Sequence, residues 1–187
     1  MTTTPALTLR TFDALAPARD DLVAVYCDVR ADLLHLPNYA VAAFVERLDR
    51  HGSDPGWTAV LAYADDGEPV GYAYSNVISA DDRWWKRFTP FPAPEFIEQP
   101  AIALKELGLR VPWRKTGTSL RLHDTLLAAH VTEPYVSLMV NPAAGGGKVQ
   151  RLYESWGYQS VGISQPSPES PVLSAMIRPT RLSGAPT

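Results

Sequence analysis

The sequence predicts a single α/β domain, residues 1–187, in which short strands alternate with amphipathic helices. Of the 187 residues, 45% are hydrophobic and 20% are charged, which is ordinary for a globular protein with one core. Apolar residues recur at helical spacing in some segments and as short continuous runs in others. The resulting order is one strand, two helices, three strands, then helix, strand, helix and two strands.

The first half of the chain is predicted to contain two helices and three strands. Apolar stripes at i, i+3, i+4 and i+7 define the helices, one from Leu22 and the other from Val41. Asp65-Asp66-Gly67 separates two apolar runs and is typical of a hairpin turn. The predicted elements are a strand at 7–10, a helix at about 17–33, a helix ending near Gly52, and strands at 57–63 and 70–77.

The second half is predicted to add two helices and four strands after an irregular segment. Residues 80–100 combine five large aromatic residues with prolines, so we expect a structured loop there. Residues 179–187 are expected to form a loose tail. The predicted elements are a strand at about 101–111, a helix at about 118–131, a strand at 135–141, a helix at 145–156, and strands near 158–164 and 171–178.

The net charge argues against some kinds of binding partner, and the cysteine content indicates a cellular compartment. The net charge of −3 argues against nucleic acid or an anionic membrane as the main partner. No run approaches the roughly 20 apolar residues of a spanning helix, and the polar N-terminus does not resemble a signal peptide. The single cysteine, Cys27, fits a reducing cytoplasm and is expected to be a buried core thiol. The excess of arginine over lysine favours a bacterial source.

A basic, glycine-containing turn follows the strand predicted at about 101–111, and a helix is predicted to start at its end. A helix N-terminus carries unpaired backbone N–H groups and a partial positive charge, so it can bind a diphosphate. Gly117 permits close approach of the backbone, and Arg114 and Lys115 add positive charge. The residues that could cap the helix or donate a hydroxyl are Thr116, Thr118 and Ser119. An ordinary strand–turn–helix connection is the alternative.

A second motif combines a short strand with an amphipathic helix. The run at 135–140 is apolar and suits a buried strand, Asn141 follows it, and Gly157 is placed to end the helix. The apolar face of that helix is formed by Val149, Leu152, Tyr153 and Trp156. Its place on this face also allows Tyr153 to be a core aromatic residue.

Together these motifs resemble the acyl-CoA core of the GNAT superfamily of N-acetyltransferases. The turn fits the family pattern of Arg or Gln, two residues, Gly, one residue, then Gly or Ala, with Ser119 at the last position. Leu152-Tyr153-Glu154, with Gly157-Tyr158 after two further residues, fits the second part of the pattern. The order of elements also matches over nearly the whole chain. The resemblance implies a central mixed β-sheet with helices on both faces, in which the strands at 101–111 and 135–141 splay apart.

The resemblance also implies a co-substrate and a reaction. Acetyl-CoA would donate its acetyl group to a primary amine by direct attack in a ternary complex, and free backbone N–H groups would hold the thioester carbonyl. Tyr153 would protonate the departing CoA thiolate. The pantetheine arm would pair with the strand at Leu107, Leu109 and Val111. The remaining residues expected to bind the cofactor are Arg114, Lys115, Thr116, Gly117, Thr118, Ser119 and Asn141.

Direct attack requires an uncharged amine, so a base must remove a proton. Glu106 lies one position before the residues expected to pair with pantetheine, and the resemblance makes it the candidate base. A strand carboxylate held in a salt bridge is the alternative interpretation.

The acceptor site has weaker candidates. His35, between the first two predicted helices, and the pair Trp84 and Trp85 could line it, although each also suits a structural role. His123 and His130 are expected to face solvent, and no spacing of His, Cys and Asp predicts a metal site. The acceptor would be a small-molecule or peptide amine, and a homodimer is compatible with the family.

Two other classes of function stay open. The same fold could be a non-catalytic acyl-CoA-binding module that senses CoA or regulates a partner. Alternatively, the aromatic segment at 84–96 could be a docking surface for another protein, which predicts a contiguous exposed aromatic patch.

Overall fold

The computed structural model describes residues 6–182, which form the predicted mixed α/β fold. The hydrogen-bonded strand order is β1-β2-β3-β5-β6-β8-β7-β4. β5 and β6 pair in parallel, whereas β2 is antiparallel to β1 and β3, and β8 to β6 and β7. The strands are β1 (Thr8–Phe12), β2 (Thr58–Tyr63), β3 (Pro69–Ile78), β4 (Phe88–Thr89), β5 (Ala101–Leu109), β6 (Tyr135–Val140), β7 (Gln159–Ser164) and β8 (Leu173–Pro179).

Five α-helices and five 3-10 turns connect these strands within the described residues. None of the helices is both long and apolar enough to span a membrane. The helices are α1 (Arg19–Val29), α2 (Val41–Gly52), α3 (Arg83–Lys86), α4 (Thr118–Ala128) and α5 (Lys148–Ser155). The 3-10 turns are η1 (Ala31–Leu33), η2 (Pro37–Tyr39), η3 (Pro94–Phe96), η4 (Val111–Trp113) and η5 (Ala144–Gly147).

The chain divides into two compact units that share strands β3 and β5. The first unit contains described residues 6–76 and 105–131, and the second contains 77–104 and 132–182. The prediction of one domain over residues 1–187 therefore stays a prediction. Of the predicted tail, Pro179 still belongs to β8 and the N–H of Thr180 donates to a backbone carbonyl, whereas residues 183–187 lie outside the described residues.

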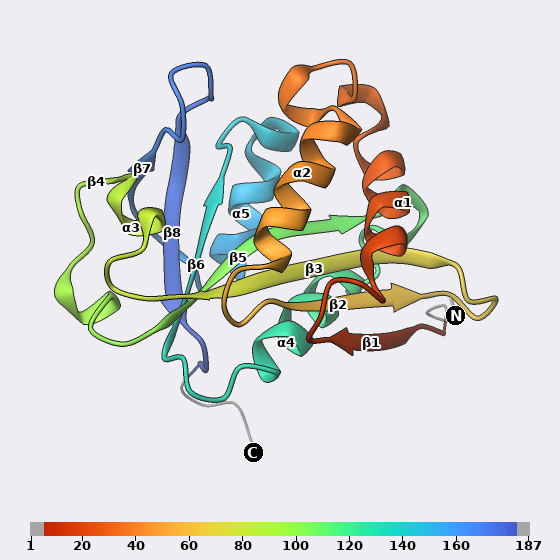
Figure 1. Ribbon diagram of the computed structural model, residues 1–187, viewed down its shortest axis with the longest axis horizontal. Helices are drawn as coiled ribbons and strands as arrows, with labels where there is room; N and C mark the ends of the chain where they lie inside the picture. The colour runs from red at the N-terminus through yellow and green to blue at the C-terminus, as the bar shows by residue number, and fades with distance from the viewer. Residues whose placement is uncertain (1–5, 183–187) are drawn as a thin grey trace. The chain divides into compact units, whose positions relative to one another are not determined.

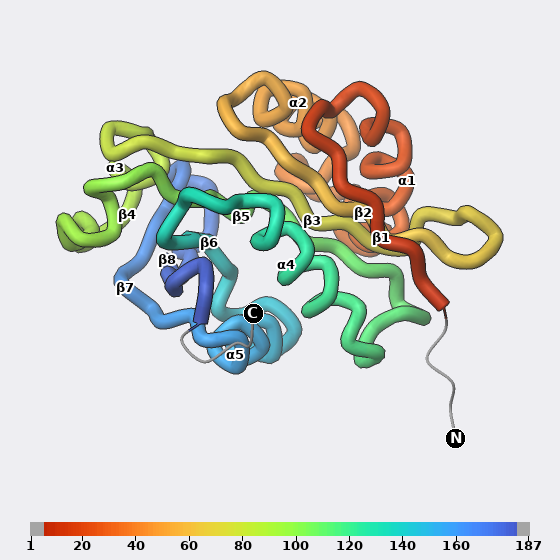
Figure 2. The backbone as a smooth tube through the Cα atoms, turned by 90° about the horizontal axis from the view of Figure 1, so that it is seen from below, coloured from red at the N-terminus to blue at the C-terminus, as the bar shows by residue number. Residues whose placement is uncertain are grey.

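The first unit has helices on both faces of its strands. Figure 1 shows α1 and α2 on one face of β2 and β3 and α4 on the opposite face, and Figure 2 shows the same layering from below. Between α1 and α2, the rings of Tyr26 and Phe44 stack with centroids 3.7 Å apart and planes inclined by 2°. Both side chains are fully buried, so this stack forms part of the core that holds the two helices against the sheet.

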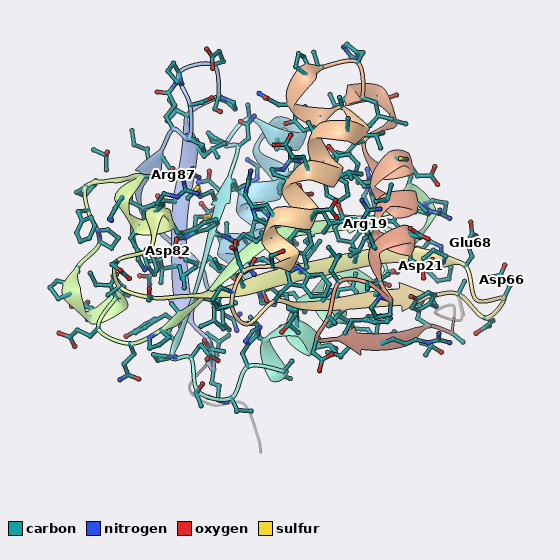
Figure 3. The ribbon with its side chains drawn as sticks, in the orientation of Figure 1. Arg19, Asp21, Asp66, Glu68, Asp82 and Arg87 are labelled. Carbon is teal, nitrogen blue, oxygen red and sulfur yellow. The ribbon has the colours of Figure 1, made fainter. Side chains whose placement is uncertain are left out.

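The predicted hairpin joins β2 and β3. Gly67 has a left-handed φ of 86°, a conformation that residues with a Cβ rarely adopt. The N–H of Glu68 donates to Oδ1 of Asp66 at 3.0 Å, and the N–H of Ala64 donates to the carbonyl of Glu68 at 2.9 Å. Asp66 and Glu68 mark the tip of this hairpin in Figure 3. The conformation of Gly67 and these hydrogen bonds within residues 64–68 therefore account for the turn between β2 and β3.

In the second unit, the parallel pairing of β5 with β6 is short. It joins Ile102 to Val136 and Ala103 to Ser137, at the start of both strands, whereas β6 pairs with β8 along its whole length. This limited ladder agrees with the predicted divergence of the two strands. The segment predicted as a structured loop at 80–100 also contains α3 and β4, and β4 adds an edge strand beside β7.

Three predicted elements end earlier than expected. The helix predicted at about 118–131 ends as α4 at Ala128, and the other two have a local backbone cause. α1 ends at Val29 because Arg30 leaves helical geometry, with φ −108° and ψ 13°, and η1 follows. β5 ends at Leu109, and η4 follows with Pro112 in its first turn, because proline has no N–H for a strand ladder and suits a helix start. Cys27 is half-buried, so its predicted full burial is wrong.

We expect Phe44→Ala to lower the free energy of unfolding by about 3–5 kcal/mol, because it removes the stacked partner of Tyr26 and leaves a cavity. Phe91→Ala is the matched control, since Phe91 is 56% exposed. The control should stay within about 0.5 kcal/mol of the wild type. Urea unfolding followed by circular dichroism measures both, and equal losses would contradict this assignment of the core.

Candidate active site

The turn between β5 and α4 contains two residues in left-handed backbone conformation. Gly117 has a φ of 82°, and Lys115, which carries a Cβ, has a φ of 63°. Left-handed geometry costs a residue with a Cβ roughly 1–2 kcal/mol. Backbone strain of this kind is retained mainly at functional sites. The observed outlier therefore supports a binding role for the turn.

Helix α4 begins after Gly117 without a side-chain cap. The Thr116 hydroxyl donates to the carbonyl of Trp113 at 2.6 Å and lies 2.8 Å from the hydroxyl of Thr118. Of the two roles predicted for Thr116, Thr118 and Ser119, helix capping is therefore wrong, and donation of a hydroxyl to a cofactor stays a prediction. Backbone N–H groups of the first turn are left for an external acceptor, and a Cβ at Gly117 would meet open space.

Positive charge borders this turn. Arg114 and Lys115 are exposed, and Nε of Arg114 donates to the carbonyl of Leu109 at 3.0 Å, which holds the guanidinium at the end of β5. The helix N-terminus adds its own partial positive charge. The turn therefore has the features of an anion site built from backbone groups and two cations.

Glu106 lies in the middle of β5, within the first unit, and contacts side chains from two other elements. The Tyr72 hydroxyl, from β3, donates to Oε2 at 3.2 Å. Nη2 of Arg47, from α2, donates to Oε1 at 3.4 Å. The Glu106 side chain is 15% exposed and that of Arg47 is 30% exposed. Glu106 therefore forms a salt bridge, as the alternative interpretation of this residue predicted. Its side chain still reaches solvent.

The phenols around Glu106 are held in their neutral form. Burial raises the pKa of Tyr72 well above its ordinary value, and the charge of Glu106 raises it further. The same two causes raise the pKa of Tyr74 and of Tyr26. These side chains therefore act as neutral walls and hydrogen-bond donors at neutral pH. The Tyr26 hydroxyl, for example, donates to the carbonyl of Tyr39 at 2.9 Å.

Two of the three residues predicted to pair with pantetheine lie in β5. Leu107 is half-buried and Leu109 is buried, whereas Val111 lies in η4 and is 67% exposed. The strand position predicted for Val111 is therefore wrong. Gly108 is required for the site in another way, since a Cβ there would come within 2.9 Å of the Tyr72 ring. The missing side chain lets Tyr72 lie against β5 beside Glu106.

Tyr153 lies near the end of α5, in the second unit. The helix is closed by Gly157, whose φ is 89°. The N–H of Gly157 donates to the carbonyl of Glu154 at 3.0 Å, and that of Tyr158 to the carbonyl of Tyr153 at 3.1 Å. This pair of bonds is a Schellman motif, which confirms the predicted helix end. The half-buried Tyr153 ring packs edge-on against Trp156 and Tyr158, with centroids 5.4 and 5.6 Å away.

A buried arginine fixes the same end of α5. Nη1 of Arg178, from β8, donates to the carbonyl of Trp156 at 2.5 Å, and its guanidinium lies 5.6 Å from the centre of the Tyr158 ring. The predicted cofactor role of Asn141 stays a prediction, whereas the apolar face predicted for α5 is only partly buried. Oδ1 of Asn141 accepts the N–H of Ala143 at 2.9 Å and so closes a turn after β6. On the predicted apolar face of α5, Val149 and Leu152 are exposed.

The residues predicted to line the acceptor site are not brought together within either unit. Trp85 is fully buried in the second unit and donates its Nε1–H to the carbonyl of Ser79 at 3.1 Å, so its predicted contact with a substrate is wrong. Trp84 is half-buried and donates to Oγ of Ser137 at 3.0 Å. His35 is exposed between η1 and η2, in the first unit.

The predicted solvent exposure of His123 and His130 is also wrong. His123 is fully buried, and Nε2 of His130 lies 2.9 Å from the hydroxyl of Ser75. His123 shares a face of α4 with the buried Leu126, at helical spacing, whereas His130 lies just beyond the end of α4 at Ala128. For His123 the spacing therefore contained the signal for burial, and the polarity of histidine concealed it.

Sequence reasoning missed Arg47 and Tyr72 as partners of Glu106. Arg47 is separated from Glu106 by 59 positions and Tyr72 by 34, and no local pattern links them. The one available signal was the alternation of Tyr72 with Tyr74 in β3, which places both rings on one face of the strand.

The fold of this chain, with its strand order and short parallel ladder, is similar to that of solved acetyltransferases, several of them from the GNAT family. An acetyltransferase of the GNAT family from Staphylococcus aureus MU50 aligns with a TM-score of 0.63 and 12% identity, over 93% of this chain and 100% of that chain. Ard1 from Thermoplasma volcanium aligns with a TM-score of 0.62 and 18% identity, over 93% of this chain and 97% of that chain.

A third similar structure contains this fold as a small part. It is a GCN5-related glucosamine N-acetyltransferase region in a fungal multi-domain GH3 β-N-acetylglucosaminidase, with a TM-score of 0.62 and 12% identity. The alignment covers 85% of this chain and 18% of the fungal chain. A scan of protein-family models and a search of curated proteins gave no match to this chain. The similarity to solved structures therefore establishes the fold.

We expect Tyr72→Phe to lower the free energy of unfolding at pH 7 by about 1–2 kcal/mol, because Glu106 loses one of its two donors. Tyr135→Phe is the control, since the Tyr135 ring is half-buried, edge-on to Phe96 at 5.1 Å, and its hydroxyl does not contact Glu106. Chemical denaturation measures both changes. A loss for Tyr72→Phe no larger than that of the control would show that its bond to Glu106 contributes little.

Proposed function

We propose that this chain is an acetyl-CoA-dependent N-acetyltransferase that transfers the acetyl group to a primary amine by direct attack in a ternary complex. The observation that carries the proposal is the strained, uncapped turn at Lys115 and Gly117 on a GNAT fold. A backbone turn that leaves helix N–H groups without side-chain caps suits a diphosphate better than it suits a simple connection.

We assign the removal of a proton from the acceptor amine to Glu106. An amine that attacks must first lose its proton, and a partly exposed carboxylate can accept that proton directly or through one water molecule. The nitrogen lone pair then attacks the thioester carbonyl carbon, and the carbon–sulfur bond breaks. Tyr72 and Arg47 hold the carboxylate in one position through its two oxygens, which favours productive geometry.

We assign protonation of the leaving group to Tyr153, as the family resemblance implied. Its hydroxyl would donate a proton to the CoA thiolate. The Schellman motif and the edge-on contacts with Trp156 and Tyr158 support this assignment, because they hold the backbone and ring of Tyr153 in a defined position.

The exposure of the aromatic segment favours the enzyme over a docking module. A docking surface at residues 84–96 requires a contiguous exposed aromatic patch. Trp85 and Phe88 are buried, Trp84 and Phe96 are half-buried, and Phe91 is the aromatic residue of this segment with a large exposed area. A non-catalytic CoA-binding module remains the alternative that requires an activity measurement.

Calorimetric titration with acetyl-CoA should give a dissociation constant in the micromolar range for the wild-type protein, and Gly117→Glu should abolish binding. The carboxylate would occupy the open space in front of the α4 N-terminus and repel the diphosphate. Gly67→Glu is the matched control, because Gly67 has a similar φ of 86° and also faces open space.

Both variants force a residue with a Cβ into left-handed geometry, so both should lose a similar amount of stability. Normal acetyl-CoA affinity in Gly117→Glu would remove the turn from the cofactor site. No binding by the folded wild-type protein would overturn the proposed function.

We expect Tyr153→Phe to reduce the turnover number by roughly 100-fold while the affinity for acetyl-CoA is nearly kept, because the general acid is lost and the ring is retained. Release of free thiol, followed with a chromogenic disulfide reagent and an accepted amine, measures the rate. Tyr158→Phe, which alters the neighbouring ring, serves as the control. Unchanged turnover in Tyr153→Phe would return Tyr153 to a packing role.

A further inference from the structure

Helix α5, which contains Tyr153, is held in the second unit with little contribution from apolar burial. None of its eight residues is buried, and Val149 and Leu152 are 36% and 40% exposed. A surface helix normally owes its place to an apolar face packed on the core. Polar bonds to neighbouring elements must therefore fix much of the position of α5, and with it that of Tyr153.

Side-chain bonds from β8 reach both ends of α5, and Figure 2 shows the helix beside this strand. Near the start of the helix, the hydroxyl of Ser174 donates to Oε1 of Gln150 at 2.9 Å. At its end, Nη1 of Arg178 donates to the carbonyl of Trp156 at 2.5 Å. The second bond is the one beside Tyr153, because the Tyr153 and Trp156 rings are in edge-on contact.

Arg178 is a buried cation, and each of its three nitrogens donates to a backbone carbonyl. Nε bonds the carbonyl of Pro179 at 3.0 Å and Nη2 that of Thr180 at 3.2 Å, so these two bonds hold the guanidinium on its own strand. Nη1 reaches Trp156, which is 22 positions away. No carboxylate among residues 6–182 pairs with Arg178. A helix C-terminus, with free carbonyls and a partial negative charge, stabilises such a cation.

Arg178 also contacts one of the two rings on which Tyr153 rests. Its guanidinium carbon lies 5.6 Å from the centre of the Tyr158 ring, and the centre of the Tyr153 ring lies 5.6 Å from the same point. Trp156 and Tyr158 are both buried, and their planes are inclined to that of Tyr153 by 88° and 77°. Arg178 therefore holds the backbone of one supporting residue and the ring of the other.

We infer that Arg178 is a positioning residue for Tyr153, which it aims by fixing the end of α5 and the rings that support the phenol. The inference rests on the proposed function, in which the Tyr153 hydroxyl protonates the CoA thiolate. Proton transfer requires heavy atoms about 2.6–3.2 Å apart, and a displacement of about 1 Å can lower a rate roughly 100-fold. Loosening the end of α5 should therefore slow turnover.

Arg178→Lys tests this role, because lysine keeps the charge but lacks the planar fork that bonds three carbonyls at once. We expect kcat in the thiol-release assay to fall at least about 10-fold while KM for acetyl-CoA stays within about twofold. Ser174→Ala is the matched control, since it removes the bond from β8 to the other end of α5. Its kcat should stay within about twofold, and an equal loss in both variants would overturn the inference.

Combination with Tyr153→Phe separates positioning from a general loss of structure. If Arg178 acts through the Tyr153 hydroxyl, Arg178→Lys should change the kcat of Tyr153→Phe by less than about twofold, because the two residues act as one unit. If the two losses multiply, Arg178 supports the enzyme independently of Tyr153, and the inference is rejected.

Nuclear magnetic resonance tests the inference without turnover. In protein labelled with ¹³C in its tyrosine rings, the Tyr153 signal is identified by its loss in Tyr153→Phe. Arg178→Lys should shift the Tyr153 and Tyr158 signals, and Ser174→Ala should leave them in place. If these shifts occur but no amine is acetylated, the proposed function fails and the contact of Arg178 with Tyr153 stands. An unshifted Tyr153 signal in folded Arg178→Lys rejects the inference whatever the activity.

The wild-type protein allows a test that does not depend on the folding of a variant. In ¹⁵N spectra, the two Nη groups of Arg178 should give separate signals, because their bonds to the carbonyls of Trp156 and Thr180 slow rotation of the guanidinium. A single averaged Nη signal would show that Arg178 does not hold the end of α5, and would overturn the inference.

Discussion

The carboxylate of Glu106 must be satisfied where it lies, in the middle of β5 and mostly out of solvent, and much of the first unit is arranged to meet that requirement. A buried charge is costly unless it is paired and hydrogen-bonded. β3 supplies the Tyr72 hydroxyl and α2 supplies the Arg47 guanidinium. Arg47 is in turn held by two carbonyls near the start of its own helix. Gly108 serves the same purpose, because any side chain at this position would displace the Tyr72 ring.

The proposed anion site, in the turn after β5, is built differently, because no side chain caps the helix that follows. The Thr116 hydroxyl donates to the Trp113 carbonyl, and Lys115 adopts a left-handed conformation. Backbone N–H groups are therefore the proposed binding groups, and they suit a diphosphate. One strand thus connects a site made of charged side chains with a site made of backbone. This division suits a protein that binds a constant cofactor and a specific acceptor.

Features that depend on neighbouring residues were predictable from the sequence, whereas features that depend on distant contacts were not. The hairpin at Gly67 and the helix end at Gly157 each carry their own local signal, and both are confirmed. The turn before α4 has the left-handed glycine that its sequence indicated, whereas its binding of an anion stays a prediction. The pairing of Arg47 with Glu106 spans 59 positions and depends on how α2 packs on the sheet. Val111 and His123 were errors of a different kind. Pro112 and the helical spacing of α4 signalled their positions, but strand continuity and side-chain polarity were given more weight.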